Sequence, residues 1–161
     1  MAKPKKKNPT PVIENRRARH DYHIGDTVEV GIVLLGSEVK AIRDANVSIA
    51  EGYVTATEEP LGLALHSVNI GPYGPAGVVA HPAVRVRELL AHKREIVKLA
   101  KQVSLKGVTI VPLKLYFKDG FAKLLIGVGT GKTSHDKRDS IAERESQRDI
   151  QRAMSKRMKT R

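Results

Sequence analysis

The sequence predicts a mainly β protein: a small antiparallel barrel with flanking helices, followed by a basic C-terminal tail. Two observations predict this fold class. Segments rich in β-branched and apolar residues recur between turn signals and indicate five or six strands. The formal net charge of +12 is concentrated at the two ends of the 161-residue chain, outside the part that carries these strands. A chain of this length holds one ordinary domain, so a single core is expected.

The first strand is expected over residues 27–35, which are rich in valine, isoleucine and leucine and are followed by a glycine. Ser37 can then cap a short helix over 38–43, because a serine side chain accepts a hydrogen bond from the first backbone N–H groups of a helix. That helix would bury Val39 and Ile42 on one side.

Two further strands are expected over 47–57 and 61–70, joined by a Glu-Glu-Pro turn. A loop rich in glycine and proline follows at 71–77. Residues 86–103 then form an amphipathic helix, because apolar residues from Leu89 onward recur at spacings of seven, three and four.

The last two strands are expected at 108–117 and 121–128, around the Asp119-Gly120 pair that is typical of a hairpin turn. Antiparallel strands in this number favour a closed or nearly closed barrel, because closure removes exposed sheet edges. The oligonucleotide-binding type of barrel suits a basic protein, although composition alone does not select it over another small barrel.

The charge pattern divides the chain into three parts. Residues 1–11, with three prolines and four lysines, are too polar to fold and form a disordered basic arm. Residues 12–129 form the barrel body. Alternating glycines at 127–131 predict a flexible hinge, and residues 130–161 form a basic tail with ten Lys or Arg against five Asp or Glu.

The tail predicts a polar helix over about 138–158, a segment without glycine or proline. Arg144, Arg148, Arg152 and Lys156 recur every four residues, which would place them in one slowly drifting row. Because burial normally supplies most helix stability, we expect the tail to be disordered when free and helical on a partner. A solvated helix without a partner is the alternative.

Two segments resemble catalytic or metal motifs, and neither supports that chemistry. The glycines before Lys132 look like a phosphate-binding loop, but three residues separate Gly127 from Gly-Lys where the motif needs four. His20 and His23 have metal-ligand spacing without a third ligand in register. We therefore expect no catalytic residue, no metal and no cofactor.

Two absences set the expected location. The sequence contains no cysteine, which excludes a disulfide framework. It also lacks an apolar run of the ~20 residues that a membrane-spanning helix needs, and its start lacks a signal peptide. We expect a cytoplasmic protein that makes no membrane contact.

The segment before the first strand predicts an RNA contact. It combines amide, guanidinium, imidazole and phenol groups, which hydrogen-bond to or stack on phosphates and bases. Since only 4% of residues are aromatic, a folded RNA is a better partner than a long single strand. The alternative is a solvated basic linker. The candidate RNA-binding residues are Asn15, Arg16, Arg17, Arg19, His20 and Tyr22.

Several ordered blocks, spread from about Asn15 to Arg152, resemble one family. These blocks are Asn15-Arg16-Arg17-Ala18-Arg19-His20-Asp21-Tyr22, Gly31-Ile32-Val33-Leu34, Glu38-Val39-Lys40, His92-Lys93-Arg94-Glu95-Ile96, Pro112-Leu113-Lys114-Leu115-Tyr116-Phe117-Lys118, Gly131-Lys132 and His135-Asp136-Lys137-Arg138. The sequence is thereby similar to small protein B, the SsrA-binding protein family of bacterial trans-translation.

The resemblance implies a six-stranded oligonucleotide-binding barrel and no enzymatic activity. It implies binding of the barrel to the tRNA-like domain of tmRNA, delivery to stalled ribosomes, and a tail that folds as a helix in the empty mRNA channel. It adds Glu29, Leu90 and Lys123 to the barrel residues expected to contact RNA. It assigns to the decoding centre the tail residues Gly131, Lys132, His135, Asp136, Lys137 and Arg138, and the cations Arg144, Arg148 and Arg152 would follow along the ribosomal RNA.

The sequence departs from the family pattern at His23, Val30, Glu88, Ala91 and Thr133. A ribosome-associated structural or assembly protein would share the charge and the extended tail. That alternative would prefer ribosomal particles and ignore tmRNA, whereas an adaptor would bind isolated tmRNA in competition with tRNA. We expect a monomer in the free state.

Overall fold

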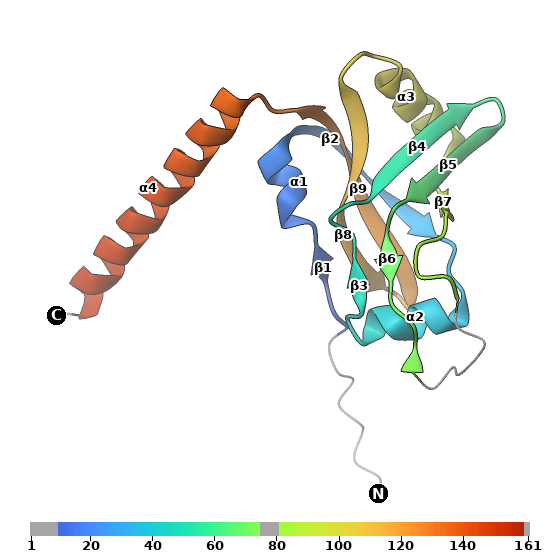
Figure 1. The fold of residues 1–161 in the computed structure, drawn as a ribbon, viewed down its shortest axis with the longest axis horizontal. Coiled ribbons are helices and arrows are strands. Elements are labelled where there is room, and N and C mark those ends of the chain that lie inside the picture. The colour runs from blue at the N-terminus through green and yellow to red at the C-terminus, as the bar shows by residue number, and fades with distance from the viewer. Residues whose placement is uncertain (1–9, 75–80, 160–161) are drawn as a thin grey trace, which may run out of the picture.

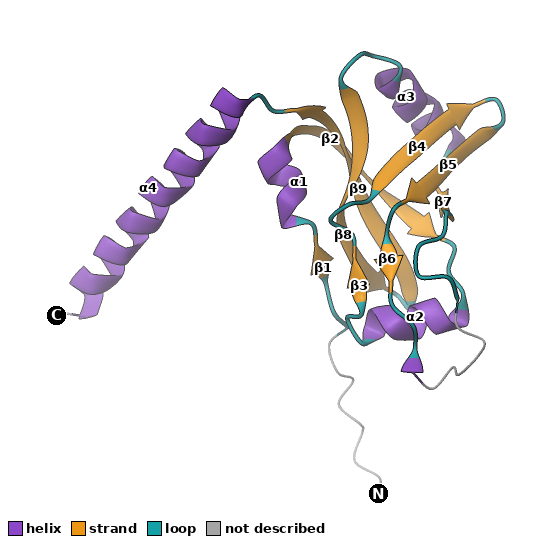
Figure 2. Ribbon diagram, viewed as in Figure 1, coloured by secondary structure: helices purple, strands orange, loops and turns teal. Residues whose placement is uncertain are grey.

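Antiparallel strands form a closed ring in the computed structural model, which describes residues 10–74 and 81–159 (Figures 1 and 2). The strands are β1 (Ile13–Glu14), β2 (Tyr22–Ile32), β3 (Val47–Ser48), β4 (Tyr53–Glu58), β5 (Leu61–His66), β6 (Asn69–Ile70), β7 (Arg87–Leu90), β8 (Val108–Lys118) and β9 (Phe121–Gly131). The helices are α1 (Arg16–Asp21), α2 (Gly36–Arg43), α3 (Lys93–Val103) and α4 (Ser134–Lys159).

The ring runs β8-β4-β5-β7-β2-β9 and closes through the pairing of β9 with β8. β1 pairs with β8 at Lys114 and Leu115, beyond the point where β4 pairs with it at Ile110, and β3 pairs with β6 as a separate ribbon. Closure satisfies the backbone groups that a flat sheet would leave at its edges. The predicted small antiparallel barrel with flanking helices is confirmed.

Alternating side chains of the ring fill one apolar core. Val30 and Ile32 of β2 and Leu124 and Ile126 of β9 are buried, as period-two alternation requires of strands with one face inward. α2 lies near one end of the barrel and α3 near the other (Figure 1), and Ile42 and Ile96 from these helices join the same core. Each buried apolar side chain stabilises the fold by roughly 1.5–3 kcal/mol.

The helix predicted over 86–103 is wrong in its first part. Residues Arg87–Leu90 are strand β7, which pairs with both β5 and β2, and the helix begins only at Lys93. Leu89 fits both the helical and the strand spacing of apolar residues. Pairing within the ring favours the strand, because without β7 the facing edges of β5 and β2 would remain unpaired. Glu95 marks the start of α3, because its side chain accepts the backbone N–H of His92 at 3.0 Å.

The expected cap of α2 is also wrong. Ser37 lies inside the helix, and its hydroxyl pairs with Nδ1 of His81 at 2.9 Å. The carboxylate of Glu38 accepts the Leu35 N–H at 2.8 Å in its place. Ile42 is buried as predicted, whereas Val39 is half-buried.

A buried ion network attaches β7 to α2. Glu38 and Arg87 have no exposed side-chain surface and lie 2.9 Å apart, and Arg85 adds a second ion pair to Glu38 at 2.6 Å. Burial by itself would raise the pKa of Glu38, but the hydrogen bonds from Arg85 and the Leu35 N–H, with both guanidinium charges, lower it below its ordinary value. The carboxylate is therefore charged, and losing it would leave a buried guanidinium unpaired.

Each of the two middle strands divides in two. The segment 47–57 becomes β3 and β4, and the segment 61–70 becomes β5 and β6. Gly52 lies at the first break, where an added Cβ would come within 2.7 Å of Val68. Only glycine fits at this turn, because a side chain would overlap Val68 and Pro112.

The glycines at 127–131 form no hinge. β9 continues through Gly131, and its end pairs with Tyr22 and His23 of β2. An added Cβ at Gly127 would lie 2.8 Å from side-chain atoms of Ile24 and Leu113, so this glycine permits close packing of strands. The predicted arm at 1–11 falls mostly outside the described residues, and so does the part of the 71–77 loop after Gly74.

Candidate nucleic-acid interface

Asn15 holds the short helix α1 against the barrel. Its Nδ2 donates to the carbonyls of Ile49 and Pro112 at 3.1 and 3.0 Å, and its Oδ1 accepts the Ala18 N–H at 3.0 Å. The residue is only 6% exposed. Its role in the structure is to cap and anchor α1, and this places the arginines that follow it.

α1 displays arginines because its small residue faces inward. Ala18 is buried against Val111 and Leu113, so the guanidinium-bearing residues on either side of it, Arg17 and Arg19, are exposed. Arg17 Nε donates to Asp21 Oδ2 at 3.1 Å, and its Nη1 pairs with Glu51. Arg16 and Arg19 line a pocket of about 190 Å³ on the other side, beside Lys114 of β8.

Asp21 is the most strongly perturbed carboxylate of this region. Hydrogen bonds from His20 at 2.9 Å, Lys137 at 3.1 Å and Arg17 lower its pKa to about 2. The His20 ring is thus engaged with its neighbour, and Tyr22 follows at the start of β2, half-buried. All six candidates of the N-terminal segment lie on or beside α1.

The strands bring three distant candidates onto one outer face. Val30 points into the core, so Glu29 and Gly31 point outward. Gly31 lies between Leu90 of β7 and Lys123 of β9. Leu90 is 55% exposed, and a Cβ on Gly31 would come within 3.3 Å of its Cβ. The glycine keeps this face flat between an apolar and a cationic side chain.

The carboxylate of Glu29 has two partners on this face. It accepts the Tyr116 hydroxyl and lies 3.5 Å from Nζ of Lys118. The hydrogen bond from Tyr116 holds the pKa of Glu29 below its ordinary value and raises the pKa of Tyr116. The face therefore carries a fixed negative charge among its cations, and it can donate from Lys123 and accept at Glu29.

Tyr116 also belongs to this outer face, although no role was predicted for it. It pairs with Lys123 across the β8–β9 hairpin, which gives it the same outward direction. The signal was present in the sequence, because a two-residue turn at Asp119-Gly120 pairs 118 with 121 and therefore 116 with 123.

The root of the tail is attached to α1. The Lys132 N–H donates to the Asp21 carbonyl at 2.9 Å, and its Nζ donates to the Arg19 carbonyl at 3.1 Å. Thr133 and Asp136 cap α4 reciprocally at 3.0 and 3.3 Å. Two residues that depart from the family pattern, His23 and Thr133, contact the same carboxylate here. Nε2 of His23 lies 3.5 Å from Asp136, which also accepts the Thr133 N–H.

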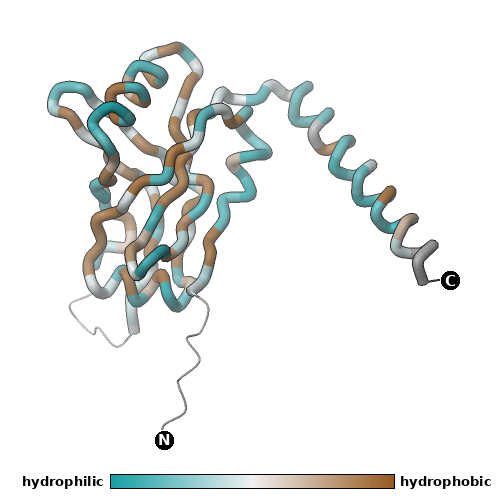
Figure 3. Tube along the Cα trace, turned by 180° about the vertical axis from the view of Figure 1, so that it is seen from behind, coloured by the Kyte–Doolittle hydropathy of each residue, from teal (hydrophilic) through white to brown (hydrophobic). Residues whose placement is uncertain are grey.

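Beyond its root, α4 leaves the body and is mostly hydrophilic (Figure 3). His135 is exposed and pairs with Asp139 at 2.9 Å, one turn along the helix. Gly131 and Arg138 are also exposed, as are the predicted ribosome-contacting cations Arg144, Arg148 and Arg152. The helix begins at Ser134, a turn earlier than predicted.

Residues that commonly bind metals do not cluster in 10–74 and 81–159. No group of three or more His, Cys, Asp or Glu side chains there could hold a metal ion. His20 and His23, weighed as a ligand pair, are engaged with two different aspartates. Within the same residues no helix is long and apolar enough to cross a bilayer.

The sequence pattern of the SmpB protein family matches residues 12–156. The chain belongs to the SmpB family. A relative from Staphylococcus carnosus, named SsrA-binding protein, is 44% identical over 157 residues, which cover 98% of this chain and 99% of the relative. Another protein of that name, from Alkaliphilus metalliredigens, is 47% identical over 145 residues, or 90% of this chain and 91% of the relative.

A solved SmpB structure has the same fold. It is described as "tmRNA-SmpB: a journey to the center of the bacterial ribosome". That chain is 40% identical to this one, with a TM-score of 0.67, over 81% of this chain and 94% of the other. The SmpB family membership and the barrel therefore rest on sequence and on structure together.

Proposed function

We propose that this protein is a non-enzymatic RNA-binding adaptor of trans-translation, which binds the tRNA-like domain of tmRNA and delivers it to stalled ribosomes. The observation that carries the proposal is the family match over nearly the whole chain. Relatives with closely similar sequences are named SsrA-binding proteins, and the similar solved structure is described as tmRNA-SmpB on the ribosome.

The barrel is assigned the tRNA-like domain. Its outer face and α1 place guanidinium and ammonium groups beside an apolar side chain and a fixed carboxylate, a mixture suited to phosphates, sugars and base edges of a folded RNA. The face contains Glu29, Leu90 and Lys123, and Arg16 and Arg19 extend it along α1. Asn15 supports these contacts by anchoring α1.

The tail is assigned the ribosome. A polar helix with regularly spaced arginines gains little from the rest of the protein and much from an anionic channel. Its root, Gly131 to Arg138, would lie at the decoding centre, where the exposed His135 ring can stack on a base. Arg144, Arg148 and Arg152 would follow the empty mRNA channel.

Removing residues 134–161 tests this division. The truncation keeps β9 and the contacts of Lys132 with α1, so binding of tmRNA in a gel shift should stay largely intact. Tagging of nascent chains on stalled ribosomes should be lost, because nothing then occupies the channel. Normal tagging by the truncated protein would contradict the assignment.

Side chains on α4 refine the test. Arg144→Ala, Arg148→Ala and Arg152→Ala together should reduce tagging, whereas Gln147→Ala with Gln151→Ala, equally exposed on the same helix, should not. A gel shift with tRNA as competitor separates the adaptor from an assembly protein, since the latter would ignore tmRNA. Because tmRNA and ribosomes are cytoplasmic, we place the protein in the cytoplasm, as a monomer when free.

A further inference from the structure

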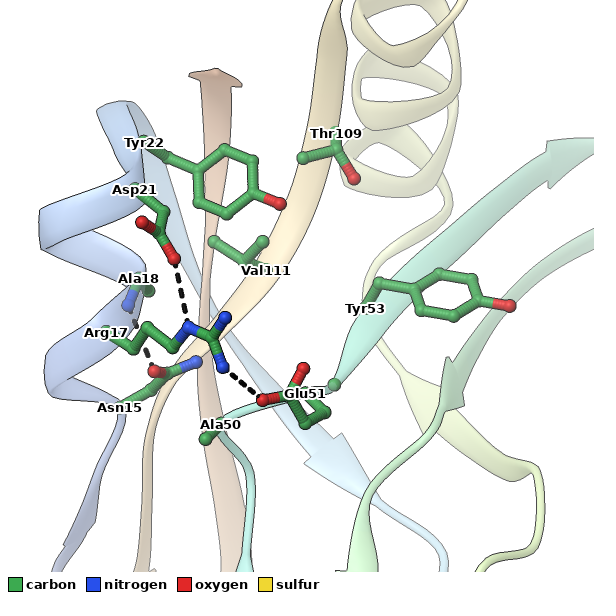
Figure 4. Close-up of a pocket in the computed structure, with 11 residues that line it drawn as sticks. Asn15, Arg17, Ala18, Asp21, Tyr22, Ala50, Glu51, Tyr53, Thr109 and Val111 are labelled. Carbon is green, nitrogen blue, oxygen red and sulfur yellow. Dashed lines mark hydrogen bonds and ion pairs between the residues drawn. The ribbon is translucent and has the colours of Figure 1, made fainter. Parts of the chain in front are cut away.

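α1 borders a second pocket, on the side opposite Arg16 and Arg19. This pocket has a volume of about 300 Å³ and lies between α1, the turn before β4, and β8 (Figure 4). Arg17, Glu51 and Tyr53 contribute to its lining. Its size is at the lower end of the ~300–1,000 Å³ typical of sites for small ligands. No residue of the outer face takes part in it.

A tyrosine stands on each of two sides of the pocket, and the Tyr53 ring extends outward from its rim, away from Arg17 (Figure 4). Two of the four tyrosines in the chain, Tyr22 and Tyr53, are among its lining residues. The Tyr53 ring is stacked on His66 with centroids 5.0 Å apart and planes 10° apart, and Thr55 Oγ1 holds the His66 ring at 2.9 Å. Tyr53 nonetheless remains 43% exposed. An exposed ring supported in one orientation is a suitable platform for a planar ligand.

The polar groups of the pocket favour a ligand that donates hydrogen bonds. Arg17 spans from Asp21 to Glu51 and binds Oε1 of Glu51 (Figure 4). Oε2 of Glu51 makes no hydrogen bond within the described residues, and the side chain is 70% exposed. The Arg17 guanidinium also offers a flat cationic surface on which a base can stack.

We propose that this pocket binds an unpaired guanine of an RNA partner. Guanine presents two adjacent donors, N1–H and the N2 amino group, and the Glu51 carboxylate can accept both, through Oε2 and through the second lone pair of Oε1 beside the one that accepts from Arg17. Adenine, cytosine and uracil each place an acceptor beside their donor, and the carboxylate would repel it. The inference rests on the proposed function for the nature of the polymer, and the guanine can come from tmRNA or from ribosomal RNA.

A titration of the full-length protein with single nucleotides tests the pocket directly. In amide NMR spectra, GMP should shift the resonances of Gly52, Tyr53 and Thr109, with weak affinity on the order of 1 mM. AMP, CMP and UMP should shift them less. Glu51→Gln should abolish the preference for GMP, because its amide donates where guanine also donates. Glu58→Gln, an exposed change at the far end of β4 that does not line the pocket, should preserve the preference.

Changes at Tyr53 separate stacking from hydrogen bonding. Tyr53→Phe should retain GMP binding, whereas Tyr53→Leu should weaken it about tenfold, the loss expected for one stacked base. Equal shifts with all four nucleotides, or shifts unaffected by Glu51→Gln, would overturn the proposal. The spectra themselves report whether each variant is folded.

RNA binding by the same variants identifies the source of the base. If the guanine belongs to tmRNA, Glu51→Gln should weaken the gel shift of the tRNA-like domain. If it belongs to ribosomal RNA, the gel shift should be unchanged and tagging on stalled ribosomes should fall. Unchanged gel shift and unchanged tagging would overturn the inference and leave the adaptor function intact, whereas a wild-type protein that ignores tmRNA would overturn the adaptor function instead.

Discussion

Asp21 shows how one side chain can serve two elements. It accepts hydrogen bonds from His20 and Arg17 of α1 and from Lys137 of α4, and its pKa falls from 3.8 to about 2. A depressed pKa means that folding favours the charged carboxylate. These contacts therefore stabilise the fold above pH 3.8, and their contribution is lost as the pH falls through about 2.

We expect Asp21→Asn to lower the free energy of unfolding by about 1 kcal/mol at neutral pH, because several partly exposed ion pairs disappear together. As the pH falls toward 2 the difference between the variant and the wild type should shrink to a small fraction of its neutral value, because about half of the Asp21 side chains are then protonated in the folded protein. Urea denaturation at the two pH values measures the difference. Asp119→Asn, in the β8–β9 turn, is the control, and a deficit of Asp21→Asn that persisted in acid would exclude the charge as its cause.

Leu90 and Lys123 flank Gly31 on the outer face and separate two kinds of RNA contact. Lys123→Ala should reduce the slope of log affinity against log salt concentration by about 1, because one phosphate contact is lost. Leu90→Ala should weaken binding without changing that slope, since it removes only apolar contact. Gel shifts of the tRNA-like domain over a salt series measure both, and equal slopes for the two variants would contradict the assignment of Lys123 to a phosphate.

At the scale of elements, β9 determines how the tail leaves the barrel. Its glycines pair as strand up to Gly131, and only Lys132 and Thr133 separate the strand from α4. Gly127, at the start of this segment, packs closely against neighbouring side chains, whereas Gly131, at its end, has no atom within 4 Å of an added Cβ. The tail is thus attached almost directly to a paired strand.

Two alanine substitutions within β9 test this description. Gly127→Ala should lower the free energy of unfolding by about 2 kcal/mol, because its Cβ overlaps side chains of Ile24 and Leu113 at 2.8 Å. Gly131→Ala should change it by less than about 0.5 kcal/mol, since nothing lies within 4 Å of its added Cβ. Thermal or urea unfolding compares the two, and similar losses at both positions would refute the packing role of Gly127.

At the scale of the whole molecule, a nearly neutral barrel carries a cationic helix, which among the described residues meets the barrel at its root (Figure 1). α4 is 26 residues long. After Lys137, all of its side chains that the structure describes are exposed to solvent. A helix without buried apolar surface depends on its partner for stability. That the tail unfolds in the free protein stays a prediction.

Circular dichroism measures it. The full chain and the chain lacking residues 134–161 should show nearly the same helical signal per molecule, because the tail contributes little when free. Adding an RNA whose groove binds basic helices should increase the helical signal of the full chain and leave that of the truncated chain unchanged. A free protein whose helical signal includes all of α4 would contradict the prediction.

Pattern alone was sufficient where it had a single interpretation. The Asp119-Gly120 hairpin, the alternation of β8 and β9, the polar helix of the tail and the charge at the termini were all predicted, since each depends on neighbours close in sequence. The segment 86–103 was half wrong because Leu89 satisfies helical and strand spacing alike. The glycines at 127–131 were misinterpreted because flexibility and close packing require the same residue.

The sequence by itself determined the β class, the position of most strands, the basic tail and the family. Only the tertiary structure decided that Glu29, Leu90 and Lys123 share one face, that Asn15 is a buried anchor, and that Arg17, Glu51 and Tyr53 line one pocket. The physical reason is closure of the barrel. Local pattern specifies which side chains point outward, but the register between strands distant in sequence specifies which of them become neighbours.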